Sequence, residues 1–472
     1  MIAFGTDGWR GLIAEDFTFA NVSICSQAVA DYIKHNPDIP NSLIVGYDTR
    51  FLSKEFADLV CQVMVSNNIK VYMTEVPTPT PVITYMIKQL CTGGGVIITA
   101  SHNPYAWNGF KFKSSDGGSA SQEIINTIES YILDSDPKNI YINNPMPTEM
   151  FSIIDAKQEY VEHVNKLINV ELIKQSGLKV LVDNMFGSGS GYLSEILSGG
   201  PMVVSEIHSE INPNFPTIKQ PEPIEDNLNQ LASMLRLGNE FDIGLALDGD
   251  ADRLGVIDEN GIYVSTLQSF SLLVYYFLEV KNLKGPIVKS VTNSQAIDKL
   301  GARNQVQVYE TPVGFKHLGL KMLQTGALLA GEESGGFAFS GSVPERDGIL
   351  SALFLLEFLA VSKKTCSNLL IDLYSLIGPL QYSRKDIPLN AFEMDRIRSF
   401  DVSAVSYDNC PFEIINITTI DGLKITTTEG WVSFRLSGTE PLLRIYSEGT
   451  TLEIVDELIS FVSQFLQISV DG

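Results

Sequence analysis

The chain has 472 residues, with 33 basic and 56 acidic side chains that give a net charge of −23. This length predicts about three domains, and a hydrophobic content of 44% can fill several cores. The negative charge opposes binding to nucleic acids and to anionic membranes.

The cysteines do not form a recognisable framework. They are odd in number, scattered and without a Cys-x-x-Cys pair, which disfavours disulfides and a zinc site. No basic and apolar leader precedes Phe4, so we expect a cytoplasmic protein. The longest apolar stretch, 349–361, contains Glu357 and is too short to span a bilayer, so it predicts a buried helix.

The first region, 1–150, alternates apolar strands with helical segments. Ser42 to Tyr47, Ile69 to Thr74 and Gly95 to Thr99 are the predicted strands, and a polar stretch at 134–147 closes the region. Strands that alternate with helices favour parallel pairing.

The third of these strands ends abruptly at Ser101. Such strand ends are where open α/β sheets bind ligands, so Ser101 is a candidate nucleophile, although a structural serine in a turn is the alternative. His102 adjoins it. Because neighbours in an extended segment point in opposite directions, turn geometry decides whether His102 can serve as the base.

The second region, 151–258, has predicted strands at 178–183, 202–206 and 243–247. A Gly-x-Gly-x-Gly follows the first of them, at Gly187 to Gly191, and imitates a dinucleotide-binding loop. Its third glycine comes one position early and no hydride-transfer site accompanies it. A dehydrogenase is therefore disfavoured.

Three aspartates, Asp248, Asp250 and Asp252, follow the last strand of this region. Carboxylates this close repel one another unless a cation lies among them, and ligands that are all oxygen favour Mg²⁺ or Ca²⁺. An EF-hand loop needs Gly at its sixth position, where this chain has Arg253. That arginine instead suggests an anion, such as a phosphate, close to the metal.

The third region, 259–378, has predicted strands at 287–291 and 306–309. A further short apolar run, 328–330, leads into a loop that offers Glu332, Glu333 and Ser334, which we call the sugar loop. Carboxylates and hydroxyls suit the recognition of sugar hydroxyl groups, although glycine-rich acidic turns are common without one.

The last region, 379–472, has strand-like runs at 414–420, 423–427 and 431–436 without crossover helices, which predicts antiparallel pairing. Arg435 and Arg444 flank a turn and can converge on one phosphate, and we call this pair the clamp arginines. A helix follows, with capping-box spacing between Thr450 and Glu453.

These loops, in this order, resemble the alpha-D-phosphohexomutase superfamily, the phosphoglucomutases and phosphomannomutases. The resemblance covers the whole chain and includes the segments 4–11, 108–111 and 311–316. It implies an α/β fold: three similar α/β domains with mixed sheets and a smaller C-terminal α+β domain around a central cleft. It also implies reversible transfer of phosphate between the 1- and 6-positions of a hexose, through a phosphoserine and a hexose 1,6-bisphosphate.

By this resemblance, Ser101 carries the phosphate and contributes to the Mg²⁺ site with the three aspartates. Proton transfer and charge stabilisation fall to a set that the sequence does not rank: Arg10, His102, Lys111 and Arg253. Glu332 and Ser334 would hold sugar hydroxyls. The remaining substrate-binding residues are Lys316, Arg435, Ser437, Gly438, Thr439 and Arg444. The implied partners are small sugar phosphates, with the bisphosphate as activator, and the implied assembly is a monomer or a homodimer.

One departure bears on the substrate. Phosphoglucosamine mutases and many dual-specificity members carry His after the first glycine of the sugar loop, where this chain has Gly336. This departure and the segment 311–316 favour glucose, with mannose open. The alternatives are a phosphoglucosamine mutase and a serine-dependent sugar phosphatase. A silent sugar-phosphate-binding protein is disfavoured because the serine, metal and clamp positions are all filled.

Overall fold

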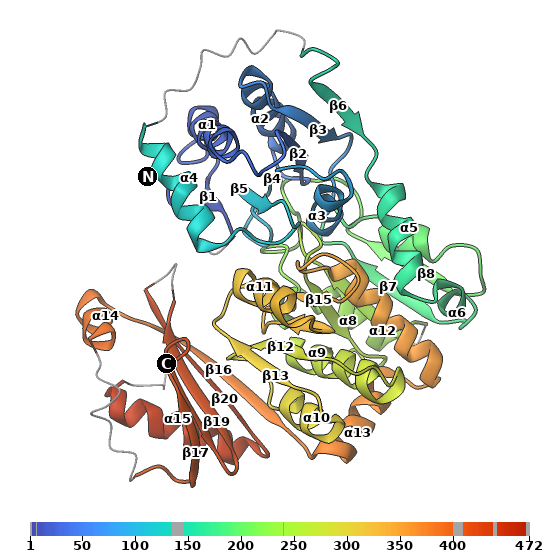
Figure 1. Ribbon diagram of the computed structural model, residues 1–472. Helices are drawn as coiled ribbons and strands as arrows, with labels where there is room; N and C mark the ends of the chain where they lie inside the picture. Colours follow the sequence, from blue (N-terminus) through green and yellow to red (C-terminus); the bar gives the residue numbers. More distant parts are fainter. Residues whose placement is uncertain are drawn as a thin grey trace.

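The computed structural model describes residues 2–5, 7–134, 146–238, 240–399, 409–437 and 441–468. Its described strands form four separate sheets (Figure 1). Three of these sheets combine parallel and antiparallel pairs and carry helices, while the fourth is antiparallel throughout. The chain therefore has three α/β units and a C-terminal α+β unit, as expected.

The first sheet has the order β1-β5-β4-β2-β3-β6. Its strands are β1 (Trp9–Leu12), β2 (Ser42–Tyr47), β3 (Lys70–Thr74), β4 (Gly94–Ile98), β5 (Trp107–Ser114) and β6 (Phe151–Ile154). Its helices are α1 (Phe19–His35), α2 (Ser53–Ser66), α3 (Thr80–Gln89) and α4 (Gln122–Asp134). Ile97 packs into one core and its neighbours Val96 and Ile98 into another, which explains the continuous apolar run of β4.

The second sheet has the order β11-β10-β9-β7-β8. Its strands are β7 (Lys179–Asp183), β8 (Val203–Ile207), β9 (Ile243–Leu247), β10 (Leu254–Ile257) and β11 (Tyr263–Val264). The helical segments of this part are α5 (Lys157–Leu167), α6 (Val170–Lys174), α7 (Tyr192–Ile196), the 3₁₀ turn η1 (Glu225–Asn227) and α8 (Asn229–Gly238). The parallel pairs β7–β8 and β7–β9 are joined by antiparallel β10, so the sheet is mixed.

The third sheet has the order β13-β12-β14-β15. Its strands are β12 (Ile287–Ser290), β13 (Val308–Thr311), β14 (Leu329–Gly331) and β15 (Phe337–Phe339). Its helical segments are α9 (Thr266–Tyr275), the π segment η2 (Tyr276–Val280), α10 (Ala296–Asn304), α11 (Phe315–Thr325), α12 (Gly348–Ser362) and α13 (Cys366–Ile377).

The fourth sheet has the order β16-β20-β19-β18-β17, and every pair is antiparallel, which confirms the expectation for this region. Its elements are β16 (Gln381–Pro388), α14 (Ala391–Arg398), β17 (Ile414–Thr418), β18 (Leu423–Thr427), β19 (Gly430–Leu436), β20 (Leu442–Gly449) and α15 (Leu452–Leu466). The N-cap of α15 is Thr451 rather than Thr450, because the Thr451 hydroxyl accepts from the Ile454 backbone N–H.

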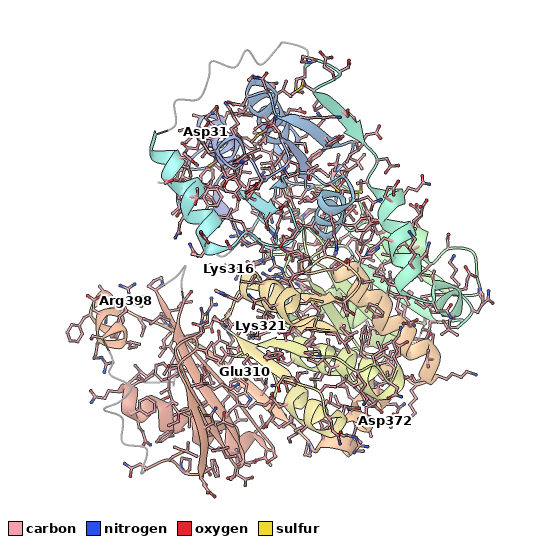
Figure 2. All side chains as sticks on the ribbon, viewed as in Figure 1. Asp31, Glu310, Lys316, Lys321, Asp372 and Arg398 are labelled. Carbon is pink, nitrogen blue, oxygen red and sulfur yellow. The ribbon has the colours of Figure 1, made fainter. Side chains whose placement is uncertain are left out.

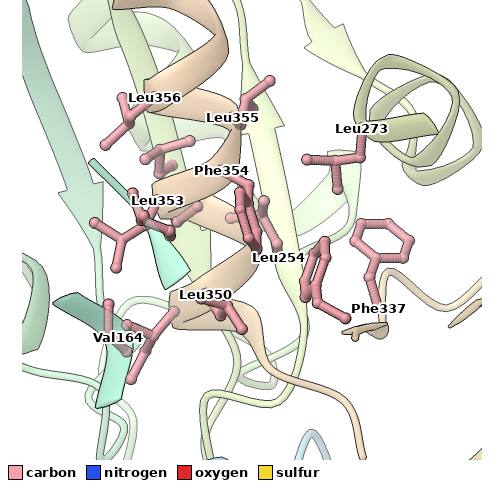
Figure 3. Packing of buried hydrophobic residues seen from close by; sticks show 14 of the residues in the cluster. Val164, Leu254, Leu273, Phe337, Leu350, Leu353, Phe354, Leu355 and Leu356 are labelled. Carbon is pink, nitrogen blue, oxygen red and sulfur yellow. The ribbon is translucent and has the colours of Figure 1, made fainter. Parts of the chain in front are cut away.

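The apolar helix expected at 349–361 is α12, and it joins the second and third units. Leu350, Leu353 and Phe354 on α12 belong to one core with Val164 of α5 and Leu254 of β10 (Figure 3). These two units therefore share a core. The C-terminal unit has its own core, between its sheet and α15.

Two unit boundaries lie later than the expected positions 150 and 258. Strand β6 pairs with β3 in the first sheet, and β11 pairs with β10 in the second. Polar loops marked both boundaries in the sequence. After each loop, however, the chain adds one more short edge strand to the sheet that precedes the loop. No described helix has the length and apolar character that a membrane crossing requires.

A buried hydrogen bond between the second and third units makes a stability prediction. The Tyr160 hydroxyl donates to the Asp347 carboxylate, at 2.9 Å from Oδ1 and 2.8 Å from Oδ2, and both side chains are buried. Tyr160→Phe removes this donor and should lower the free energy of unfolding by about 1–3 kcal/mol. Thermal unfolding followed by circular dichroism measures the loss. Tyr105→Phe, at an exposed tyrosine, is the control, and an equal melting temperature in both variants would contradict the prediction.

Candidate active site

Ser101 lies three residues beyond the end of β4 and is 1% exposed. Its backbone is left-handed, with φ of 53°, a conformation that is uncommon for a residue other than glycine. Its Oγ donates to Asp248 Oδ2 at 2.9 Å. The sequence-predicted nucleophile therefore contacts the first aspartate of the predicted metal site.

His102 lies on the same side as Ser101, in contrast to neighbours in an extended strand. The left-handed turn at Ser101 brings Nδ1 of His102 to 3.3 Å from Oγ of Ser101. Burial, together with the charges of Arg253, Arg10 and Lys111, holds the pKa of His102 well below its usual range. The lowered pKa favours the neutral imidazole, and its tautomer decides whether Nδ1 donates to Oγ or accepts from it.

The three aspartates follow β9 in the second sheet, and all three are fully buried. Their candidate ligand oxygens lie within 4.8 Å of one another. Burial and the charges of Asp252 and Asp250 raise the pKa of Asp248 well above its usual range. Unrelieved repulsion of this kind is what a bound cation removes.

The oxygen atoms of this trio fit a hard divalent cation. Oδ1 of Asp250 and Oδ1 of Asp252 are buried and have no hydrogen-bond partner among the described residues. Buried acceptors without a donor are costly, and Mg²⁺ or Ca²⁺ would satisfy them. The trio thus fits a divalent cation in its chemistry as well as in its spacing.

Lys111 and Arg346 compensate part of the negative charge. Lys111 Nζ lies 2.9 Å from Asp250 Oδ2 and 2.8 Å from Asp7 Oδ2. Arg346 Nη2 lies 2.9 Å from Asp252 Oδ2 and 2.7 Å from Asp7 Oδ2. Although burial opposes the charged form, Asp250 and Asp7 raise the pKa of Lys111, which therefore stays protonated.

Arg10 and Arg253 also lie close to the serine loop and His102. Arg10 Nη1 donates to Asn103 Oδ1 at 2.5 Å, beside the serine loop. Arg253 Nη1 lies 3.3 Å from Glu222 Oε1, and His102 Nε2 lies 3.9 Å from the same oxygen. The structure therefore brings together the four residues considered for proton transfer and charge stabilisation.

The sugar loop follows β14. Glu332 is buried, and its Oε1 accepts from Ser334 Oγ at 2.6 Å and lies 3.4 Å from Arg346 Nη1. Arg346 thus connects this loop to the aspartate trio. A Cβ atom at Gly336 would lie 2.2 Å from Cδ of Arg346, so this arginine fills the space that a larger side chain at 336 would need.

The two clamp arginines lie opposite each other on β19 and β20. Arg435 Nε lies 3.0 Å from Asp421 Oδ2, and Arg444 Nε lies 3.6 Å from Asp386 Oδ2. Asp421 Oδ2 also accepts from the Val313 backbone N–H at 3.0 Å, which ties the clamp to the segment 311–316. Ser437 is buried at the end of β19, whereas Gly438 and Thr439 lie outside the described residues.

Lys316 lies at the start of α11, between the first unit and the rest of the molecule (Figure 2). Its Nζ donates to Gln122 Oε1 at 2.7 Å, so it reaches toward the first unit. Lys316 thus contacts the first unit, whereas the two clamp arginines contact Asp421 and Asp386 of the fourth.

The glycine-rich loop after β7 has a packing role. Ser188 N donates to the Gly249 carbonyl at 3.0 Å, and a Cβ atom at Gly187 would lie 2.8 Å from the same oxygen. These glycines allow the loop to lie directly against the aspartate loop. This close approach explains the imitation of a dinucleotide-binding sequence.

The sequence did not indicate several charged residues of this site, among them Asp7, Arg50 and Arg346. Asp7 lies within the N-terminal segment that carried the resemblance, but nothing marked it as the partner of two lysines and an arginine. Arg346 precedes Asp347, the N-cap of α12, so its signal was that of a helix start. Arg50 follows β2 in an ordinary polar turn.

Comparison with known proteins places all four units in one family. The phosphoglucomutase/phosphomannomutase models match as alpha/beta/alpha domain I at residues 1–139, domain II at 158–261, domain III at 268–377 and the C-terminal domain at 391–464. A phosphoglucomutase/phosphomannomutase of Thermococcus kodakarensis is 29% identical, over 99% of both chains. A protein of Methanothermobacter thermautotrophicus named a probable phosphoglucosamine mutase is 32% identical, over 95% of this chain and 94% of that protein. A Thermus thermophilus crystal structure with the description "putative phosphomannomutase" has a TM-score of 0.84 at 30% identity, with 99% of both chains covered.

Proposed function

Since this chain belongs to the phosphoglucomutase/phosphomannomutase family, an intramolecular phosphotransferase activity follows, and we propose that Ser101 carries the phosphate in it. The observation that supports this role is the 2.9 Å contact of Ser101 Oγ with Asp248, beside two buried acceptors that lack a donor. The enzyme is a phosphohexomutase, and the substrate we propose is glucose 1-phosphate, in equilibrium with glucose 6-phosphate.

In the proposed reaction, phospho-Ser101 transfers its phosphoryl group to the free 6-hydroxyl of the sugar. The P–Oγ bond breaks, a bond from phosphorus to the sugar oxygen forms, and the proton of the hydroxyl ends on the serine oxygen. The resulting hexose 1,6-bisphosphate reorients; the bond from phosphorus to the sugar 1-oxygen then breaks, a bond from phosphorus to Ser101 Oγ forms, and the serine proton ends on the 1-oxygen. Atoms and charge balance over this cycle, and the bisphosphate also serves as activator.

The residues around Ser101 can be given proposed roles from their contacts. Asp248, Asp250, Asp252 and the phosphoserine oxygen would hold Mg²⁺, which supplies charge neutralisation during transfer. His102 is a candidate for proton transfer, since its Nδ1 is 3.3 Å from Oγ. Lys111, Arg10 and Arg253 would stabilise the negative charge of the transferring group.

Substrate binding is proposed for the two remaining groups. Glu332 and Ser334 would hold sugar hydroxyls, and Lys316 would contribute from the start of α11. The non-reacting phosphate would lie on the clamp of Arg435, Ser437, Gly438, Thr439 and Arg444. Binding energy from this remote phosphate can orient the reacting end of the sugar.

The clamp makes a prediction for Arg435→Ala. The change removes charge-assisted hydrogen bonds worth roughly 1.5–3 kcal/mol, so kcat/KM for glucose 1-phosphate should fall about 10- to 150-fold at 1.4 kcal/mol per decade. Both phosphates of the sugar use one clamp in alternate orientations, so the forward and reverse reactions should suffer similarly. Steady-state kinetics in both directions measure the effect. Arg398→Ala, at an exposed arginine of the same unit, is the control, and unchanged kcat/KM in Arg435→Ala would remove this residue from the clamp.

A substrate comparison tests the proposed function. Purified enzyme is assayed with glucose 1-phosphate, mannose 1-phosphate and glucosamine 1-phosphate side by side, with Mg²⁺ and a trace of the matching bisphosphate. The highest kcat/KM should belong to glucose 1-phosphate. Preference for glucosamine 1-phosphate would instead favour a phosphoglucosamine mutase, the name carried by the Methanothermobacter relative. Release of inorganic phosphate without isomerised product would indicate a phosphatase.

A further inference from the structure

Arg50 is a buried arginine behind the serine loop, and it is 4% exposed. Its Nη2 donates to the carbonyl oxygens of Ser101 at 2.6 Å and Asn103 at 2.7 Å. Its Nη1 donates to the carbonyl oxygens of Pro104 at 2.9 Å and Trp107 at 3.1 Å. One guanidinium therefore binds three backbone carbonyls of the loop that carries the nucleophile and the carbonyl of the first residue of β5.

The guanidinium of Arg50 is itself held on two sides. Its Nε donates to Asp48 Oδ2 at 3.1 Å, and Asp48 Oδ1 accepts from the Arg50 backbone N–H at 3.0 Å. The ring of Phe215, from the second unit, lies 5.0 Å from the guanidinium carbon. With these contacts all five N–H groups of the guanidinium are used, so its position is determined by both units.

The serine loop requires such a support. Ser101 has a left-handed backbone, and a residue other than glycine keeps this conformation only where its surroundings enforce it. The carbonyl groups of Ser101 and Asn103 also need donors, and no helix or strand lies between β4 and β5 to supply them. The planar fork of arginine can serve several acceptors at fixed angles, which a lysine with three donors on one nitrogen cannot do.

We propose that Arg50 is a positioning residue for phosphoryl transfer, which places the phosphate on Ser101 relative to the sugar hydroxyl. The inference rests on the proposed role of Ser101 as phosphate carrier. Arg50 does not reach the substrate in this proposal. It acts through the backbone of residues 101–107.

A loosened serine loop should change where the phosphate goes. Transfer to the sugar needs the phosphorus close to, and in line with, a hydroxyl that is held in a fixed position, whereas a water molecule is free to move to the in-line position of a displaced phosphate. When water attacks phospho-Ser101, the P–Oγ bond breaks, a bond from phosphorus to the water oxygen forms, and the serine oxygen takes a proton. A variant with a loosened serine loop should therefore show a larger fall in the rate of phosphoryl transfer to the sugar than in the rate of transfer to water.

Arg50→Lys is the main test. We expect kcat for glucose 1-phosphate to fall about 10- to 100-fold, the range that a misplacement of about 1 Å can cause. The KM for glucose 1-phosphate should change less than about twofold, because the clamp of the fourth unit is untouched. Phosphorylated Arg50→Lys, prepared with the bisphosphate, should give a higher ratio of inorganic phosphate to isomerised product than the phosphorylated wild type gives.

Asp48→Asn is the second variant, because it weakens the contact that holds Arg50 and leaves the arginine in its pocket. It should give a smaller fall in kcat and a smaller increase in phosphate release than Arg50→Lys. Arg236→Lys is the matched control, because Arg236 also donates to a backbone carbonyl, that of Gly261, away from the serine loop. If folded Arg50→Lys keeps the wild-type kcat and phosphate release, or if both variants only lower the melting temperature, the positioning role is wrong. Failure of the proposed function would differ, because the wild type would then form no phosphoserine.

Discussion

Replacement of Ser101 by Ala should lower mutase turnover on the order of 10⁴- to 10⁶-fold, the loss seen when a covalent nucleophile is removed. The variant should keep its fold, because it loses one hydroxyl and its hydrogen bond to Asp248. The coupled assay with glucose 1-phosphate measures turnover. Mass spectrometry of the intact protein should show a phosphorylated species in the wild type and none in the variant.

A matched control separates this loss from a general effect of removing a serine. Ser205→Ala changes a serine on β8, the edge strand of the second sheet, and should keep wild-type turnover and phosphorylation. Full activity of Ser101→Ala would refute the covalent mechanism. A phosphorylated species that persists in that variant would assign the carrier to another residue.

Weakening the metal site should have the second-largest effect. Asp250→Asn replaces a carboxylate whose Oδ1 lacks a hydrogen-bond partner among the described residues and whose Oδ2 contacts Lys111. Changes outside the ligand shell already cost about 10- to 100-fold in metal affinity, so removal of a charged ligand should raise the Mg²⁺ requirement at least that much. EDTA should stop turnover of the wild type, and added Mg²⁺ should restore it.

The measured quantity is the Mg²⁺ concentration that gives half-maximal turnover, supported by calorimetric titration of Mg²⁺ alone. Asp242→Asn is the control, because Asp242 lies just before β9, at the end of the strand opposite the trio. Ca²⁺ should bind but support little turnover, since its looser coordination positions the transferring oxygens poorly. Wild-type turnover in metal-free buffer would contradict a metal-dependent reaction.

Local features of this protein were predictable because they depend on neighbours in sequence. The strands expected at 42–47, 243–247 and 423–427 coincide with β2, β9 and β18, since short apolar runs bounded by polar turns form strands in many contexts. Ser101 and the aspartate trio each occupy one short loop at a strand end. Their chemistry was visible in the residue types and the spacing.

The charged network between these loops could not be predicted from the sequence. Arg346 and Asp7 meet at 2.7 Å although 339 positions separate them, and Lys111 meets Asp250 across 139 positions. A salt bridge leaves no periodic signal in either segment. The four-carbonyl contact of Arg50 is likewise invisible, because backbone acceptors exist at every residue and only the turn of 101–107 points them at one place.

The sequence by itself therefore determined the family and the groups that we propose for its chemistry: a serine, three aspartates, the loop of Glu332 to Ser334 and a pair of arginines. Tertiary structure decided how those groups face one another. The left-handed turn at Ser101 puts His102 beside its hydroxyl, and Arg346 links the sugar loop to the aspartate trio. The physical reason is that residue type and strand pattern are local properties, whereas the direction of a side chain and its charged partners depend on packing between distant segments.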